Sequence, residues 1–208
     1  MAYDFPLTMP TNVKPNRVTV SPLSTVGVST SPYTLQQQKF KWAGEAWAFK
    51  VTYPPMTRDQ AEEWLAFFLE CQGRYGTFLF GDPAGAVPRG VGGGTPLVDG
   101  AGQTVGGYAL AVKGCPASTV GWLKKGDYIQ VGEGEEAELH KLIRDADSNA
   151  DGDVTLYFWP ALRRSPADEE TVVIEGAQGC FSMQSNMNGW DVDVGMEFGI
   201  AFDVVESF

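Results

Sequence analysis

The chain has 208 residues, a formal net charge of −11 and a pI near 4.5. This acidity excludes a nucleic-acid or anionic-membrane surface as the expected partner, because there is no basic footprint to release counterions. No stretch of 18 apolar residues occurs, and no basic region followed by an apolar run opens the sequence, so we expect neither a spanning helix nor a signal peptide. With 20% charged residues, 25 Gly and 13 Pro, the composition favours short strands, many turns and extensive subunit contacts.

The N-terminal third alternates between proline-rich and strand-like sequence. Residues 1–32 contain five prolines, so we expect an extended N-terminal arm that carries at most a short strand at residues 17–20 and can lie across a neighbouring subunit. Two strand-like stretches follow, at residues 33–42 and 46–53, separated by a short glycine-containing segment at 43–45. This pattern predicts a β-hairpin.

The next segment predicts an amphipathic helix from Thr57 to Gln72. Thr57 and Gln60 have the spacing of a capping box, and Gly73 stands where a helix usually ends. The apolar residues at three- and four-residue spacing are Ala61, Trp64, Leu65, Phe68 and Cys71. We expect this face to pack on the sheet, and a strand to follow at residues 75–80.

A glycine-rich stretch, residues 81–94, then predicts a linker or a mobile loop. Beyond it lie five short strand-like segments, at residues 108–112, 127–131, 137–143, 154–159 and 171–174. Five strands in about eighty residues are typical of a small barrel or sandwich.

The last segment shows the strongest period-two alternation in the chain. From Trp190 to Val204 every second residue is apolar, Val194 among them, and most of the intervening residues are acidic or glycine. Only an extended strand has this period. We expect one long strand that closes a sheet begun earlier in the sequence.

The predicted fold is therefore mainly β: a sandwich or barrel body with one flanking α-helix and an inserted small β-barrel module. We divide the chain into an extended arm at residues 1–32, a body at residues 33–82 plus 181–208, and an inserted β module at residues 95–178.

The reactive side chains do not form a catalytic or metal-binding pattern. Cys71, Cys115 and Cys180 are odd in number and widely spaced, and His140 is the single histidine, so we expect buried free thiols, a structural or surface histidine and no cofactor. The segment 147–152 matches half of an EF-hand loop, but Phe158 stands where a bidentate glutamate is needed, which favours a hairpin turn.

The acidic side chains favour solvated surfaces over acid–base chemistry. Asp191 and Asp193 lie about 7 Å apart on one strand face by strand rise and could flank a glycosidic bond. Nothing around them predicts the apolar pocket that would raise one pKa, so a wet strand face is the favoured interpretation. The acidic run at residues 133–138 is likewise expected to be a wet loop.

Trp122 is the remaining candidate contact residue. It lies in an expected loop, where an exposed indole could stack on a glycan or fill a pocket of a neighbouring subunit. Burial in the core is the alternative.

Several segments together resemble the distal tail proteins of long-tailed bacteriophages and prophages. They are residues 72–83, 112–114, 123–132 and 159–164, and the likeness covers roughly residues 30–205. The resemblance implies a tail-tube-like β body with a flanking helix, a peripheral β insert and a hexameric ring at the host-facing end of the tail tube. It implies no catalytic residues.

We therefore expect a structural virion protein at the distal tail tip, assembled in the host cytoplasm and not an enzyme. The expected partners are other copies of the chain in a ring, the tail tube protein and the hub or fibre proteins of the tail tip or baseplate. The alternative is a carbohydrate- or receptor-binding β module of the tail tip, with Trp122 as its contact residue.

Overall fold

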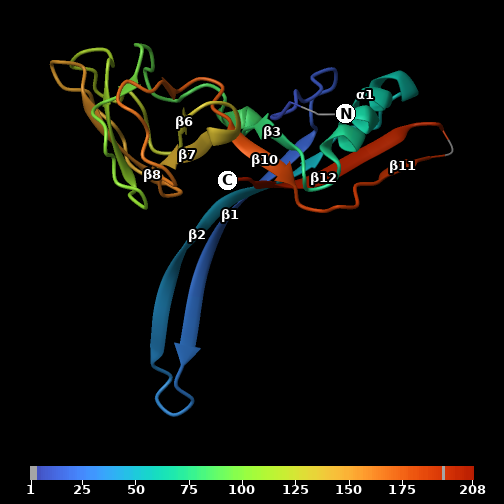
Figure 1. The fold of residues 1–208 in the computed structure, drawn as a ribbon, viewed down its shortest axis with the longest axis horizontal. Helices are drawn as coiled ribbons and strands as arrows, with labels where there is room; N and C mark the ends of the chain where they lie inside the picture. Colours follow the sequence, from blue (N-terminus) through green and yellow to red (C-terminus); the bar gives the residue numbers. More distant parts are fainter. Residues whose placement is uncertain (1–3, 194) are drawn as a thin grey trace.

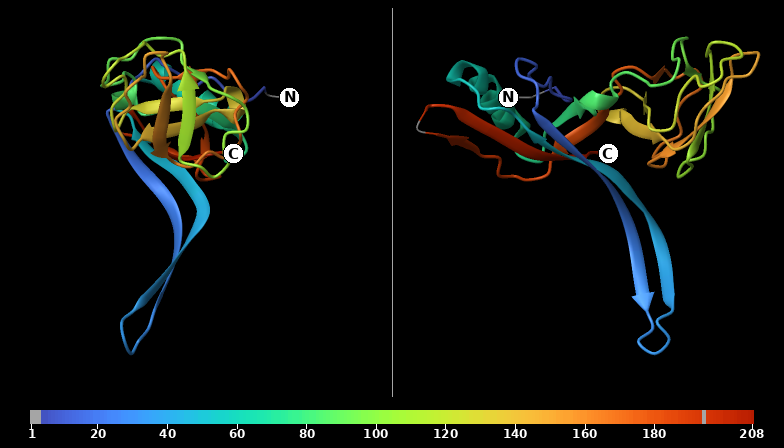
Figure 2. Two further views of the ribbon diagram at one scale, coloured as in Figure 1. Left: turned by 90° about the vertical axis from the view of Figure 1, so that its left-hand side faces the viewer. Right: turned by 180° about the vertical axis from the view of Figure 1, so that it is seen from behind.

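The structure is a computed structural model that describes residues 4–193 and 195–208. In this part of the chain, two antiparallel sheets and one α-helix form a mainly β fold, which confirms the predicted fold class (Figure 1). The body occupies the centre of the molecule, and the inserted β module and the helix lie at opposite ends of it. A long two-stranded hairpin projects away from both, as the two further views also show (Figure 2).

The body is built around one sheet. Its strands lie in the order β1 (Arg17–Thr30), β2 (Gln37–Thr52), β12 (Phe198–Glu206), β10 (Gly179–Met183) and β3 (Thr77–Phe80), and β11 (Trp190–Val192) pairs only with β12. The C-terminal strand therefore lies between strands from the first third of the chain and β10, as the alternating pattern predicts.

The helix α1 (Arg58–Cys71) covers this sheet and confirms the helix prediction. Thr57 is its N-cap, where the Gln60 side chain accepts a hydrogen bond from the Thr57 N–H at 3.2 Å. Gln72 ends the helix with a left-handed φ of 50°. The Trp64 and Phe68 rings lie 6.1 and 5.3 Å from the Phe202 ring of β12, so the apolar face of the helix packs on the sheet.

The inserted module is a nearly closed barrel-like sheet. Its strand order is β4 (Leu97–Val98), β5 (Ala109–Lys113), β8 (Val154–Trp159), β7 (Glu138–Leu142), β6 (Tyr128–Val131) and β9 (Val172–Val173). An isolated antiparallel bridge between Leu97 and Thr171 joins its two edges. The five strands predicted in this region are all present. Two short 3-10 helices, η1 (Pro83–Gly85) and η2 (Gly134–Glu136), flank the strands.

Buried apolar side chains form one cluster in the body and another in the insert. The body cluster also includes Tyr128 and Leu139 of the insert, and Trp159 packs against it. The Trp47 indole of the body meets the Trp159 ring edge-to-face at 4.6 Å. The two units thus share apolar contacts where they meet.

The strand pairing predicted for residues 17–53 is wrong. The expected arm with a short strand is in fact the 14-residue β1, and β2 runs through the segment at 43–45 without reversing. The reversal lies at residues 31–36, between Thr30 and its pairing partner Gln37. Gly44 lies in a bulge instead of a turn, because the register shifts between Ser24, which pairs with Glu45, and Val26, which pairs with Lys41.

The predicted single C-terminal strand is also wrong, because the alternating segment is a hairpin. β11 pairs antiparallel with β12, with Trp190 opposite Ile200. The turn between them uses the Asp193 side chain, which accepts the Glu197 N–H at 2.9 Å. Val194, which the pattern includes, lies outside the described residues. The alternation of apolar and polar residues continues through the short turn, so it cannot show where the turn lies.

The glycine-rich stretch is held against the insert, which corrects the expectation of a linker or mobile loop. The Val91 and Gly92 N–H groups donate to the Gly121 and Trp122 carbonyls at 3.0 and 2.9 Å. The Gly90 N–H donates to the Asp127 carboxylate at 3.1 Å. The described chain thus enters the insert through a fixed segment.

Candidate assembly surface

The most exposed element of the molecule is the outer part of the β1–β2 hairpin, residues 25–42, which we call the ribbon. It extends away from the body with its two strands paired only to each other (Figures 1 and 2). Its exposed apolar side chains, with their exposed fractions, are Val26 48%, Val28 55%, Tyr33 94%, Leu35 76%, Phe40 59% and Trp42 57%. A soluble domain normally covers such side chains, so the ribbon has the composition of a binding element.

The two faces of the ribbon differ in chemistry. Val26 lies opposite Lys41 and Val28 opposite Lys39, which makes one face apolar and basic. Phe40 lies opposite Gly27 on the other face, where its ring packs edge-to-face on Trp42 at 4.5 Å. No sheet or helix of the described residues packs on either face, and an isolated two-stranded ribbon is marginally stable in water.

The base of the ribbon is fixed to the insert by a buried carboxylate. Lys41 Nζ lies 2.5 Å from Glu45 Oε1, which also accepts the Tyr108 hydroxyl at 2.8 Å. Glu45 Oε2 accepts the Ala161 N–H at 3.0 Å. Burial raises the pKa of Glu45, but these hydrogen bonds outweigh burial and hold the pKa below its ordinary value. The direction of the ribbon is therefore set at its base.

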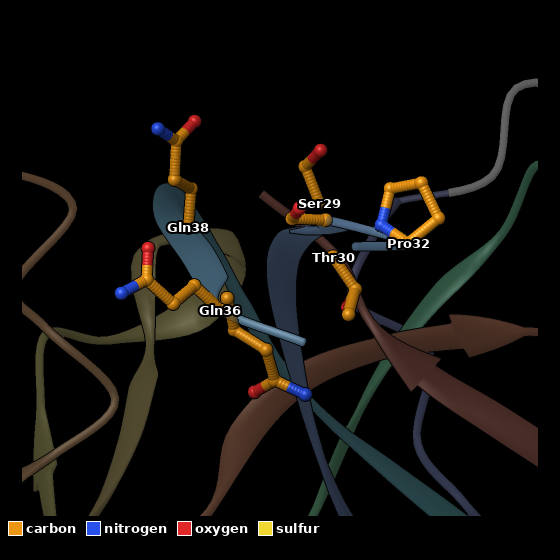
Figure 3. Close-up of a pocket in the computed structure, with 7 residues that line it drawn as sticks. Ser29, Thr30, Pro32, Gln36 and Gln38 are labelled. Atoms are coloured by element: carbon orange, nitrogen blue, oxygen red, sulfur yellow. The ribbon is translucent and has the colours of Figure 1, made fainter. Parts of the chain in front are cut away.

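The tip of the ribbon is polar. A hollow of about 510 Å³ beside the turn is lined by hydroxyl and amide side chains, among them Ser29, Thr30, Gln36 and Gln38, with Pro32 at its edge (Figure 3). The labelled side chains spread outward from the turn. They do not converge on one point, as ligand-binding groups would.

A second exposed element is the C-terminal hairpin, residues 190–206. Trp190, Val192 and Met196 are 41%, 50% and 75% exposed. Asp191 and Glu197 are also exposed. The predicted wet acidic face is therefore exposed, and the uncovered Trp190 and Val192 lie on the opposite face of β11. Asp193 lies at the turn, where its side chain accepts the Glu197 N–H, whereas Asp191 lies in β11.

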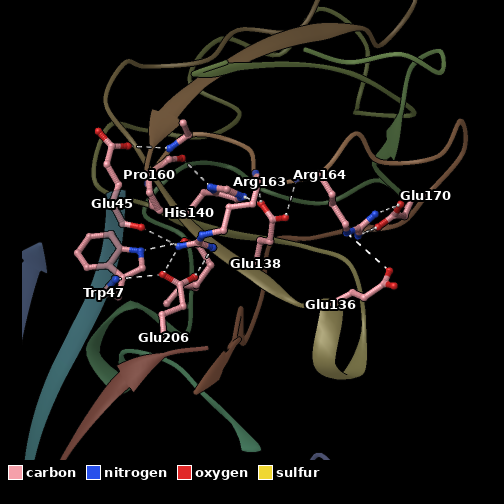
Figure 4. Close-up of polar contacts among 12 residues, drawn as sticks. Glu45, Trp47, Glu136, Glu138, His140, Pro160, Arg163, Arg164, Glu170 and Glu206 are labelled. Carbon is pink, nitrogen blue, oxygen red and sulfur yellow. Dashed lines mark hydrogen bonds and ion pairs between the residues drawn. The ribbon is translucent and has the colours of Figure 1, made fainter. Parts of the chain in front are cut away.

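A cluster of charged side chains joins the body to the insert (Figure 4). The Arg163 guanidinium binds both oxygens of Glu206, at 2.9 Å from Nη1 and 2.5 Å from Nη2. Glu206 Oε2 also accepts the Trp47 N–H at 3.0 Å, and Trp47 donates its indole N–H to the Leu139 carbonyl at 2.8 Å. These contacts attach the body to the insert at defined positions.

Glu138 and His140 extend this cluster into the insert. His140 is fully buried, with Nδ1 2.8 Å from the Pro160 carbonyl and Nε2 3.3 Å from Glu138 Oε2. Glu138 accepts the Arg163 and Arg164 N–H groups at 3.1 and 3.2 Å. The predicted wet acidic loop is therefore wrong for Glu138, which is buried because it fixes this backbone.

Trp122 is not exposed. It is fully buried in the core of the insert, and its indole N–H donates to the Gly93 carbonyl at 3.1 Å. A loop position predicts an exposed indole, but the glycine-rich segment covers the Trp122 side chain. The carbohydrate-binding alternative loses the residue on which it rested.

The remaining predicted residues have structural surroundings. All three cysteines are buried and free. The Asn149 side chain accepts the Asp151 and Asp153 N–H groups at 2.9 and 2.8 Å, which makes a turn between β7 and β8. Asp147 accepts the Gly121 N–H at 2.6 Å. Among the described residues, no three His, Cys, Asp or Glu side chains gather to hold a metal ion.

The ribbon was not predicted from the sequence as an exposed surface. Val26 and Val28 alternate with polar residues, as do Phe40 and Trp42, and this was a usable signal for strands. Alternation identifies a face but does not tell whether that face is covered by the same chain.

Comparison with known proteins finds no matching family model and no match among curated proteins. In the part of the chain that the structure describes, no helix has the length and apolar character needed to cross a membrane.

Proposed function

We propose that the protein is a structural subunit of a long-tailed bacteriophage tail. In this role it forms a ring at the distal tail tip and joins the tail tube to the host-recognition or baseplate assembly. The observation that carries the proposal is the ribbon: a fixed, projecting pair of strands with uncovered apolar side chains, which needs a protein partner to bury them.

The segments that resemble distal tail proteins add support because of where they lie. Residues 72–83 follow α1 and include β3, at the edge of the body sheet. Residues 123–132 include β6, and residues 159–164 contain Arg163 and the end of β8. The likeness thus spans the body, the insert and the junction between them.

The proposed partners are further copies of the chain in a closed ring of six, the tail tube protein and the tail-tip hub or fibre proteins. Uncovered apolar side chains on a projecting element favour assembly over catalysis, and the role requires no cofactor. The proposed location is the virion tail tip, reached after assembly in the host cytoplasm.

Imaging of tail particles tests the proposal. A peptide tag at the exposed C-terminal Phe208 can be labelled with gold on particles produced by the host strain, and purified tails can be weighed by native mass spectrometry. We expect label only at the host-facing tip and six copies per tail. Label along the tube, a single copy per tail, or absence from the particles would overturn it.

A further inference from the structure

We infer that the ribbon of one copy binds the C-terminal hairpin of the next copy, so that the subunit interface is heterologous. This inference rests on the proposed function and names the two surfaces that the assembly would use. The uncovered side chains of these two elements are complementary in both apolar character and charge.

The charge distribution is uneven along the chain. Residues 17–52 carry four basic residues and one acidic residue, a net charge of +3. Because the net charge of the whole chain is −11, the remaining residues together carry −14. Residues 165–208 contain no lysine or arginine. A second copy therefore offers the ribbon an acidic surface, whereas two ribbons placed together would repel each other.

The C-terminal hairpin is the part of that acidic surface with matching apolar side chains. Trp190 and Val192 are about half exposed and lie on β11, which pairs only on one side. Asp191 is exposed on the opposite face of β11, and Glu197 is exposed near the turn. The ribbon is divided in the same way, with Lys39 on one face and Phe40 and Trp42 on the other. Each element thus carries uncovered aromatic side chains on one face, charge on the other face and a free strand edge, so edge-to-edge pairing can place Lys39 beside Asp191 and Phe40 beside Trp190.

The ribbon and the C-terminal hairpin of one copy do not cover each other's exposed side chains. They leave the body in different directions, with the ribbon extending downward in Figure 1 and the C-terminal hairpin extending toward the end that carries α1. Binding between different surfaces of successive copies gives a ring when the rotation closes.

Charge reversal tests the contact on the full chain. Sedimentation velocity is compared for wild type, for Lys39→Glu, for Asp191→Lys combined with Glu197→Lys, and for all three changes together. We expect the first two variants to weaken self-association about tenfold or more, because like charges then face each other, and the triple variant to regain it. Lys124→Glu, an exposed lysine on the insert, is the matched control and should change nothing.

A cross-link identifies the contact directly. Because the three native cysteines are buried, Phe40→Cys on one tagged copy and Val192→Cys on another should form a disulfide between copies when mixed. A preferred bond between two Phe40→Cys copies, a wild-type chain that stays monomeric, or unchanged association in both charge variants would overturn the inference. If the label lies at the tail tip but self-association does not depend on these charges, only this inference is wrong. If self-association depends on these charges but the protein is absent from tail particles, only the proposed function is wrong.

Discussion

Glu206 is a buried carboxylate two residues from the end of the chain, and its charge is balanced from the insert. Replacing Arg163 with Met removes the guanidinium that binds both of its oxygens. We expect a loss of about 3–5 kcal/mol in the free energy of unfolding, because an unpaired charge is left in the junction. Denaturant titration measures this.

A double variant separates the charge effect from a packing effect. Adding Glu206→Leu to Arg163→Met removes the uncompensated charge, so most of the lost stability should return. If the double variant is as unstable as the single one, the ion pair is not what holds the junction.

Glu138 gives the same junction a dependence on pH. Burial raises its pKa, but contacts with His140 and the Arg163 N–H outweigh burial, so the folded-state pKa lies below the ordinary 4.5. Its ionised form therefore stabilises the fold fully above about pH 4.5, and this contribution is lost as the pH falls through the lower folded-state value.

The variant Glu138→Gln should accordingly be less stable than wild type at pH 7 by about 1.5–3 kcal/mol, the usual size of hydrogen bonds to a charged group. The difference should narrow below pH 4.5, because wild type then loses its advantage. Unfolding curves between pH 3 and 7 measure it, and a difference that stays constant over that range would contradict the role given to the carboxylate.

Trp64 is fully buried on the sheet-facing side of α1, where its indole N–H also donates to Asn12 at 2.9 Å. Trp64→Ala should cost about 3–5 kcal/mol through the cavity that it leaves. Leu69 lies on the same helix and is 70% exposed, so Leu69→Ala is the control and should change stability by about 0.5 kcal/mol or less. Equal melting temperatures for both variants would show that this face is not core.

Among the larger elements, the ribbon can be shortened without touching the body. Replacing residues 28–39 with Asn-Gly joins Gly27 to Phe40, which already face each other across the strands. The body and the base of the ribbon remain, so the melting temperature should change by about 2 °C or less, while self-association is lost. Calorimetry and sedimentation of the same sample measure both.

A large fall in melting temperature would mean that the outer ribbon stabilises the body of its own subunit. Retained association with an unchanged melting temperature would mean that the ribbon is not the assembly surface.

Elements whose signals are local in the sequence were predicted correctly, whereas contacts between residues far apart in the sequence were not. The capping residues and apolar spacing of α1 are local signals, and so are the short strands of the insert between their turns. The pairing of β1 with β2 could not be inferred, because Gly44 produces a bulge as readily as a turn and only the partner strand decides between them. Arg163 and Glu206 are 43 residues apart, and nothing in either local sequence predicts their contact.

At the scale of the whole molecule, glycine-containing segments at residues 90–94 and 176–179 border the insert at both ends, a pattern typical of an insert that can be removed. In the structure the body core continues into the insert through Tyr128 and Leu139, and Trp47 packs against Trp159. The division into body and insert stays a prediction, which deletion of the insert tests.

Joining Gly85 to Gly179 through a short linker removes the insert and leaves β3 and β10 paired. We expect this shortened chain to aggregate, because Trp47 and the apolar side chains around it lose their cover. Adding Trp47→Lys should recover part of the solubility, since a charge then replaces the exposed indole. Soluble yield and light scattering measure this. If the shortened chain without the lysine is as soluble as the full chain, the body closes its core without the insert, and the shared contacts only orient the insert against the body.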